Sequence, residues 1–230
     1  MCICDEDAHR LNIVFKEAIR LDMPIAWYAD RCSQETVDKL KGFDLTVGIY
    51  RGSGQFSEVV RQHAFDMLDR KGFGWALNWD SDETWSKTAK KDMEKSLGEY
   101  ERAIVCPMKT VWEKDNELYF REDGLCHGTQ SNTKRIRLYS LDFEWMWQDK
   151  AINGPAYMVG RQWVYPDINK LRTCNATTIH WGYADDKMRE SHKKRWDKIY
   201  TEAVGRQPYN NWEWFCDKTI EPTLTPYTEI

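Results

Sequence analysis

Two acidic residues one position apart, Asp80 and Asp82, directly follow a short apolar run in the segment Trp79-Asp80-Ser81-Asp82-Glu83. Carboxylates at this spacing repel each other unless a cation lies between them, and oxygen ligands suit Mg²⁺ and Mn²⁺. Ligands of open α/β sheets bind beyond the carboxyl ends of the strands, which is where we expect these acids. The pattern predicts a divalent-cation site that takes a diphosphate. The alternative interpretation is a polar turn in which Asp82 caps the next helix.

Strands and helices that could position these acids alternate over the first hundred residues. Apolar spacing predicts helices over 12–21, 33–40 and 56–68, and apolar runs predict strands over 24–29, 45–50 and 75–79. This rhythm is typical of βαβ units, so we expect an α/β fold with a Rossmann-like, mostly parallel central sheet flanked by helices. Further strands are expected over 103–107, 118–120, 135–139 and 156–159, and a charged helix over 185–204. We expect one domain over 1–204, with an irregular aromatic tail over 205–230 packed on it.

The composition limits the function classes. The net charge of −4 argues against a protein that binds nucleic acid by counter-ion release alone. The chain has no apolar run of about 18 residues, so no transmembrane segment is predicted, and its N-terminus does not resemble a signal peptide. Seven cysteines without a C-x-x-C pair indicate reduced thiols in a cytoplasmic protein, with peripheral attachment to the inner face of a membrane left open. Twelve tryptophans are compatible either with sugar-stacking surfaces or with an aromatic core.

Five segments, taken in order, resemble family-2 glycosyltransferases of the GT-A fold, especially the small bacterial branch that decorates surface glycans, or a viral relative. They are Cys4-Asp5-Glu6-Asp7-Ala8-His9-Arg10-Leu11, Asp30-Arg31-Cys32-Ser33-Gln34-Glu35-Thr36, Gly74-Trp75-Ala76-Leu77-Asn78-Trp79-Asp80-Ser81-Asp82-Glu83, Arg135-Ile136-Arg137-Leu138-Tyr139, and His180-Trp181-Gly182-Tyr183-Ala184-Asp185 through Lys194-Arg195. The chain departs from the family pattern at Asp5, where Asn is usual, and at Arg31-Cys32, where Asp-Gly is usual.

The resemblance implies a role for each matched residue. The donor-binding residues would be Asp5, Asp30, Asp80 and Ser81, with Asp30 holding the base or ribose. The metal ligands would be Asp82, Asp80 and His180, and a structural role for the histidine is the alternative. The cofactor would be Mn²⁺ or Mg²⁺, which neutralises the departing nucleoside diphosphate.

An inverting enzyme of this family also needs a carboxylate base for the acceptor hydroxyl, and Asp149 and then Glu144 are the candidates by their place in the resembled motif. Solvated surface acids are the alternative for both. The resemblance further implies a nucleotide-sugar donor, most simply a UDP-sugar, and transfer of a hexose or pentose to a glycan or lipid-linked glycan. Two other functions stay open, a viral DNA glycosyltransferase that acts on a hydroxymethylated base and a non-catalytic nucleotide-binding domain.

Overall fold

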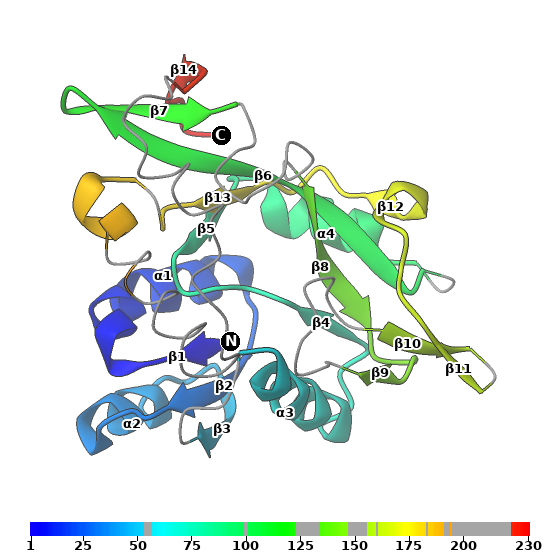
Figure 1. Cartoon of the computed structure of the whole chain (residues 1–230). Helices are drawn as coiled ribbons and strands as arrows, with labels where there is room; N and C mark the ends of the chain where they lie inside the picture. Colours follow the sequence, from blue (N-terminus) through cyan, green and yellow to red (C-terminus); the bar gives the residue numbers. More distant parts are fainter. Residues whose placement is uncertain are drawn as a thin grey trace. The chain divides into compact units, whose positions relative to one another are not determined.

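The structure is a computed structural model that describes residues 1–52, 57–98, 101–122, 134–146, 156–159, 161–182, 184–190, 194 and 222–230. The chain divides into two compact units, and Figure 1 labels its helices and strands. The first unit comprises Met1–Ser81, Lys90–Val105 and Ile136–Cys174. The second unit comprises Asp82–Ala89, Cys106–Arg135 and Asn175–Ile230.

The first unit begins with a parallel sheet whose strand order is β1-β2-β3. Its strands are β1 (Cys2–Ile3), β2 (Ile25–Asp30) and β3 (Thr46–Gly52), and the helices between and after them are η1 (Asp5–Arg10), α1 (Leu11–Leu21), α2 (Gln34–Lys41) and α3 (Ser57–Arg70). These elements confirm the predicted βαβ pattern, and the bounds of β2, β3, α1, α2 and α3 lie within two residues of the predicted ones. The α/β class is therefore confirmed.

Helices cover both faces of this sheet. The ring of Trp27 in β2 lies edge-on to Phe15 of α1, with ring centroids 6.0 Å apart. The next residue, Tyr28, points to the opposite face, where it lies parallel to His63 of α3 at 6.4 Å. Because both faces are covered, β2 is buried along its whole length, as expected for a central parallel strand.

The remaining strands of the first unit are mostly short and antiparallel. The predicted strand over 75–79 is β4 (Trp75–Leu77), and it pairs antiparallel with β8 (Lys134–Ser140) instead of extending the parallel array. A small antiparallel sheet holds β9 (Trp145–Met146), β10 (Ala156–Val159) and β11 (Gln162–Val164). The other elements are α4 (Ala89–Ser96), η3 (Ile168–Lys170) and β12 (Arg172–Thr173), which pairs with the start of β6.

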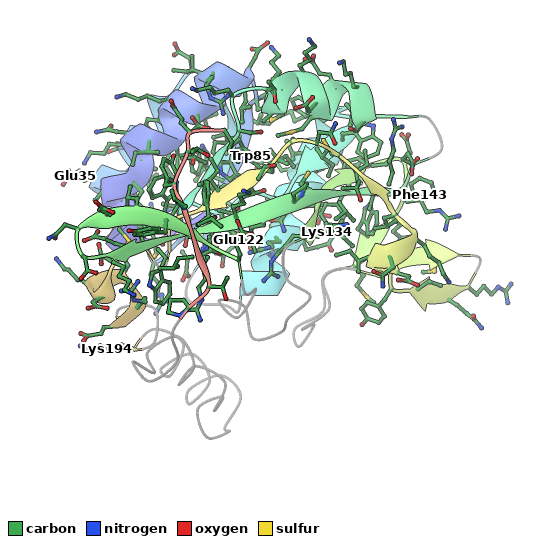
Figure 2. All side chains as sticks on the ribbon, turned by 90° about the horizontal axis from the view of Figure 1, so that it is seen from above. Glu35, Trp85, Glu122, Lys134, Phe143 and Lys194 are labelled. Atoms are coloured by element: carbon green, nitrogen blue, oxygen red, sulfur yellow. The ribbon has the colours of Figure 1, made fainter. Side chains whose placement is uncertain are left out.

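A mixed sheet forms the second unit. Its strands are β5 (Glu83–Trp85), β6 (Ala103–Lys114), β7 (Glu117–Arg121), β13 (Thr178–His180) and β14 (Leu224–Pro226), in the order β14-β7-β6-β13-β5. The first three residues of β6 belong to the first unit. Val111, Phe120 and Ile179 form the centre of its core, and Figure 2 shows the side chains of these strands, with Trp85 of β5 and Glu122 after β7 labelled.

The C-terminal part is described only in places. Residues 186–190 are helical, in agreement with the start of the charged helix predicted over 185–204. Within the tail that was expected to be irregular, β14 adds a strand antiparallel to β7. The predicted domain boundary at 204/205 lies outside the described residues.

Candidate functional site

Asp82 and His180 come together in the second unit because β5 and β13 pair antiparallel. This pairing places His180 opposite Glu83, and the Trp181 N–H donates to the Asp82 carbonyl at 2.8 Å. The side chains then meet, with Asp82 Oδ2 lying 3.3 Å from His180 Nε2. Only 10% of the aspartate side chain and 7% of the histidine side chain are exposed. The structure thus brings together two residues predicted to ligate the cation.

Gly182 provides the space for this pair. A Cβ atom at this position would lie 2.3 Å from Asp82 Oδ2, 2.8 Å from His180 Cε1 and 3.0 Å from His180 Nε2. Such short contacts would force the carboxylate or the imidazole to move. Position 182 therefore requires glycine if the two side chains are to keep their present positions.

The geometry of this pair fits two ligands of one small cation. Donors bound at about 2.1 Å and at roughly right angles around one ion lie about 3 Å apart, close to the observed 3.3 Å. Among the described residues, no group of three or more His, Cys, Asp or Glu side chains is arranged to hold a metal. Mg²⁺ and similar ions are often bound through one or two carboxylates, together with waters and substrate phosphates, and Asp82 could supply one such carboxylate.

Asp80, in the first unit, lies between two arginines. Arg61 of α3 donates through Nη2 to Asp80 Oδ1 at 2.9 Å, and Nη1 of Arg137 in β8 lies 3.7 Å from Asp80 Oδ2. The Asp80 side chain is 38% exposed, whereas that of Arg137 is only 2% exposed. The first acid of the pair is therefore held by guanidinium groups and remains accessible to solvent.

Asn78 fixes the positions of both arginines. Its side-chain oxygen accepts from Arg61 Nη1 at 3.1 Å, and its carbonyl oxygen accepts from Arg137 Nη1 at 3.2 Å. Its own N–H donates to the Arg137 carbonyl at 2.7 Å. A cavity of about 20 Å³, room for roughly one water molecule, lies beside this cluster and is lined in part by Tyr28 and Phe65.

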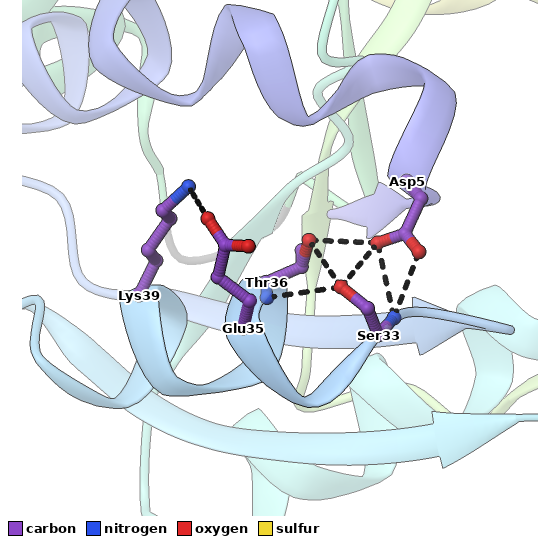
Figure 3. A network of polar contacts seen from close by, with 5 residues as sticks. All are labelled: Asp5, Ser33, Glu35, Thr36 and Lys39. Atoms are coloured by element: carbon purple, nitrogen blue, oxygen red, sulfur yellow. Dashed lines mark hydrogen bonds and ion pairs between the residues drawn. The ribbon is translucent and has the colours of Figure 1, made fainter.

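Asp5 binds the N-cap residue of α2, Ser33, and the Thr36 side chain in its first turn (Figure 3). Its carboxylate accepts from the Ser33 N–H at 2.9 Å and from the Thr36 hydroxyl at 2.7 Å. The hydrogen bond from Thr36 is the largest cause of a pKa for Asp5 below its ordinary value of 3.8, and the Ser33 backbone bond lowers this pKa further. The donor-binding role predicted for Asp5 stays a prediction, and its contacts show that it supports the start of α2.

Asp30 ends β2 at the carboxyl edge of the parallel sheet, where its predicted role requires it to be. Its Oδ2 accepts from Nε and Nη2 of Arg31, at 3.2 and 3.1 Å. Arg31 has a φ of 51°, and its N–H donates to the Gly52 carbonyl at 3.0 Å. This left-handed backbone is uncommon for arginine and sharply turns the chain after Asp30.

Three rings are stacked near this edge of the sheet. Tyr50 of β3 lies 4.1 Å from His63 and 5.5 Å from Tyr28, with all three ring planes nearly parallel. The Tyr28 hydroxyl is buried and has no hydrogen-bond partner among the described residues. Burial, with a smaller effect of the Asp30 charge, raises the pKa of Tyr28 to about 12.

The structure does not test the roles predicted for three further site residues. Ser81 is half-buried and carries no hydrogen bond through its side chain in the described part of the chain. Glu144 is exposed, and its backbone carbonyl accepts from the Met158 N–H at 3.2 Å. Asp149 lies outside the described residues. The roles predicted for these three residues stay predictions.

The sequence analysis did not identify Arg61 and Asn78 as residues that contact the site. A signal for Arg61 was present, because Ala64, Phe65 and Leu68 follow it at helical spacing and all four side chains line the same cavity. A charged residue on the apolar stripe of a helix needs an oppositely charged partner, and Asp80 is that partner.

No family model matches the chain, and no curated protein matches it. Among solved structures, S. aureus TarS (residues 1–349) is similar with 13% identity and a TM-score of 0.41, over 89% of this chain and 72% of that chain. A likeness of this size carries no conclusion about activity. In the described part of the chain, no helix is both long and apolar enough to cross a membrane.

Proposed function

We propose that the chain is a divalent-cation-dependent glycosyltransferase of the GT-A type, which moves a sugar from a nucleotide-sugar donor to a hydroxyl group of a glycan or lipid-linked glycan. The observation that carries this proposal is the buried pair of Asp82 and His180, 3.3 Å apart, in the space left by Gly182. A buried carboxylate beside an imidazole at ligand spacing suits a cation whose coordination is completed by a diphosphate.

In this proposal Asp82 and His180 hold Mn²⁺ or Mg²⁺, and Asp80 is the further candidate ligand. The cation, when bound, acts as a Lewis acid that offsets the negative charge on the departing nucleoside diphosphate. Asp30 accepts hydrogen bonds from the base or ribose at the carboxyl end of β2. For an inverting reaction, Asp149 or Glu144 takes the proton of the acceptor hydroxyl as that oxygen attacks the sugar.

The test begins with the donor. The purified chain is screened by thermal unfolding against nucleotide sugars, UDP-sugars first, with Mn²⁺, with Mg²⁺ and with EDTA. A donor at about a hundred times its dissociation constant should add about 2.7 kcal/mol of stability with the cation, and clearly less with EDTA. Donor hydrolysis and transfer to glycan acceptors are then measured with the donor that binds.

Two variants decide the assignment. Asp82→Asn should abolish cation-dependent donor binding and transfer, because an amide is a poorer ligand for a hard cation than a carboxylate. Asp44→Asn, which changes an exposed aspartate between α2 and β3, should match the wild type. Wild-type transfer by Asp82→Asn, or donor binding that is equal in EDTA, would show that the proposed site is wrong.

A further inference from the structure

The two guanidinium groups at Asp80 are arranged like those of an oxyanion site. Arg61 reaches Asp80 Oδ1 at 2.9 Å and Arg137 lies 3.7 Å from Oδ2, so the two carboxylate oxygens face different arginines. Guanidinium groups bind carboxylate and phosphate through the same planar set of N–H donors. The Asp80 carboxylate therefore faces the same N–H donors that a phosphate group would use.

Both arginines are held in position independently of Asp80. Asn78 accepts from Arg61 through its side chain and from Arg137 through its carbonyl, at 3.1 and 3.2 Å. The hydrogen bond from the Asn78 N–H to the Arg137 carbonyl, at 2.7 Å, fixes β8 beside this residue. The arginine pair would thus keep its geometry when another anion replaces the carboxylate, and such preorganisation favours binding.

The carboxylate can also be reached from solvent. Its side chain is 38% exposed, and that of Arg61 is 22% exposed. Asp80 follows β4, which ends at Leu77, so its backbone lies outside the strand. An incoming anion can therefore compete with Asp80 from solvent without unfolding an element of the sheet.

We propose that Arg61 and Arg137 bind a phosphate group and that Asp80 occupies this phosphate position in the unliganded protein. The inference rests on the proposed function only for the source of the phosphate, which is the diphosphate of the nucleotide-sugar donor. On binding, the phosphate takes over the two guanidinium groups, and the Asp80 carboxylate is released for another partner.

Calorimetry in EDTA, with inorganic pyrophosphate, UDP and uridine as ligands, tests this exchange. Arg61→Gln should weaken pyrophosphate and UDP binding by about tenfold to a hundredfold, the usual loss for a charged hydrogen bond, and leave uridine binding unchanged. Asp80→Asn should bind pyrophosphate more tightly than the wild type, because the neutral amide competes less well for the arginines. The matched control is Arg51→Gln, which changes an exposed arginine of β3 that donates to Gln34.

The opposite signs of the two variants separate exchange from a structural role. If Asp80 only supported the arginines, Asp80→Asn would weaken pyrophosphate binding. Equal or weaker binding by Asp80→Asn, or unchanged binding by Arg61→Gln with a wild-type melting temperature, overturns the proposal. Arg137→Lys, which keeps the charge and loses the planar fork, should repeat the Arg61→Gln result. Because cations are absent, failure here leaves the Asp82 and His180 site untouched, and failure of sugar transfer leaves this measurement valid.

Discussion

Replacing Gly182 by alanine should impair the cation site by adding a single methyl group. The added Cβ would lie 2.3 Å from Asp82 Oδ2 and 3.0 Å from His180 Nε2, whereas real Cβ atoms essentially never approach another atom within 3.0 Å. The carboxylate oxygen must therefore withdraw by about 0.7 Å or more, the difference between these two distances. A shift approaching 1 Å at a reacting centre typically costs on the order of a hundredfold in rate.

We expect Gly182→Ala to bind Mn²⁺ more weakly and to lower sugar transfer by about a hundredfold. Overpacking of a buried site usually costs about 1–3 kcal/mol, so the protein should stay folded with a lower melting temperature. Mn²⁺ binding can be followed by titration calorimetry without any donor, which separates the cation site from catalysis. Gly74→Ala is the matched control, because a Cβ at Gly74 meets nothing within 4 Å.

The reasoning is refuted if Gly182→Ala binds Mn²⁺ with wild-type affinity. A reduced affinity in Gly74→Ala of the same size would also refute it, because the effect would then reflect glycine replacement in general. Loss of transfer with unchanged Mn²⁺ binding would assign Gly182 to the donor or acceptor instead of the cation.

Four further outcomes are expected. Because folding lowers the pKa of Asp5, its carboxylate should contribute to stability above about pH 3.8, and this contribution should be lost as the pH falls through the lower pKa of the folded state. Acid unfolding of Asp5→Asn beside the wild type checks this, and identical acid profiles would contradict it. Tyr28→Phe should stabilise the chain by about 1 kcal/mol, because it removes a buried hydroxyl without a partner among the described residues, and denaturant unfolding with a lower midpoint would oppose this. Substituting the true base, by Asp149→Asn or Glu144→Gln, should lower turnover about a hundredfold with donor affinity nearly unchanged, whereas loss of donor binding in both variants would move these acids to the donor pocket. Reductant should leave the melting temperature unchanged, because the described cysteines 2, 4, 32, 106 and 174 form no disulfides; a fall of many degrees would contradict this.

The parallel half of the first unit was predictable because its signals are local. The helical spacing of apolar residues predicts α1 and α2 to within one residue, and Ser33 marks the start of α2 by accepting from the Thr36 N–H. Tyr28 and Trp27 are both buried, so β2 shows the continuous apolar run of a strand covered on both faces. Such patterns need no knowledge of distant contacts.

The partner of β4 could not be predicted in the same way. Only three residues form this strand, and it pairs with β8 some sixty residues later, as in the pairs Trp75–Ser140 and Leu77–Leu138. A strand this short has no periodicity that distinguishes parallel from antiparallel pairing. The arginine cluster could not be predicted for the same reason. No residue close to Arg137 in the sequence indicates that its side chain donates to the Asn78 carbonyl.

The two acids of the predicted cation motif have different surroundings, and they belong to different compact units. Asp80 belongs to the first unit and is held by Arg61 and Arg137, whereas Asp82 begins the second unit and lies beside His180. Adjacent carboxylates of the same chemistry thus have different partners, one cationic and one able to ligate a metal. Charge removal at the two positions should therefore differ in kind: at Asp82 it should weaken cation binding, and at Asp80 it should strengthen phosphate binding in EDTA. A sequence motif of two aspartates predicts that both bind one ion. The contacts of the side chains instead give them different partners, arginines for Asp80 and His180 for Asp82.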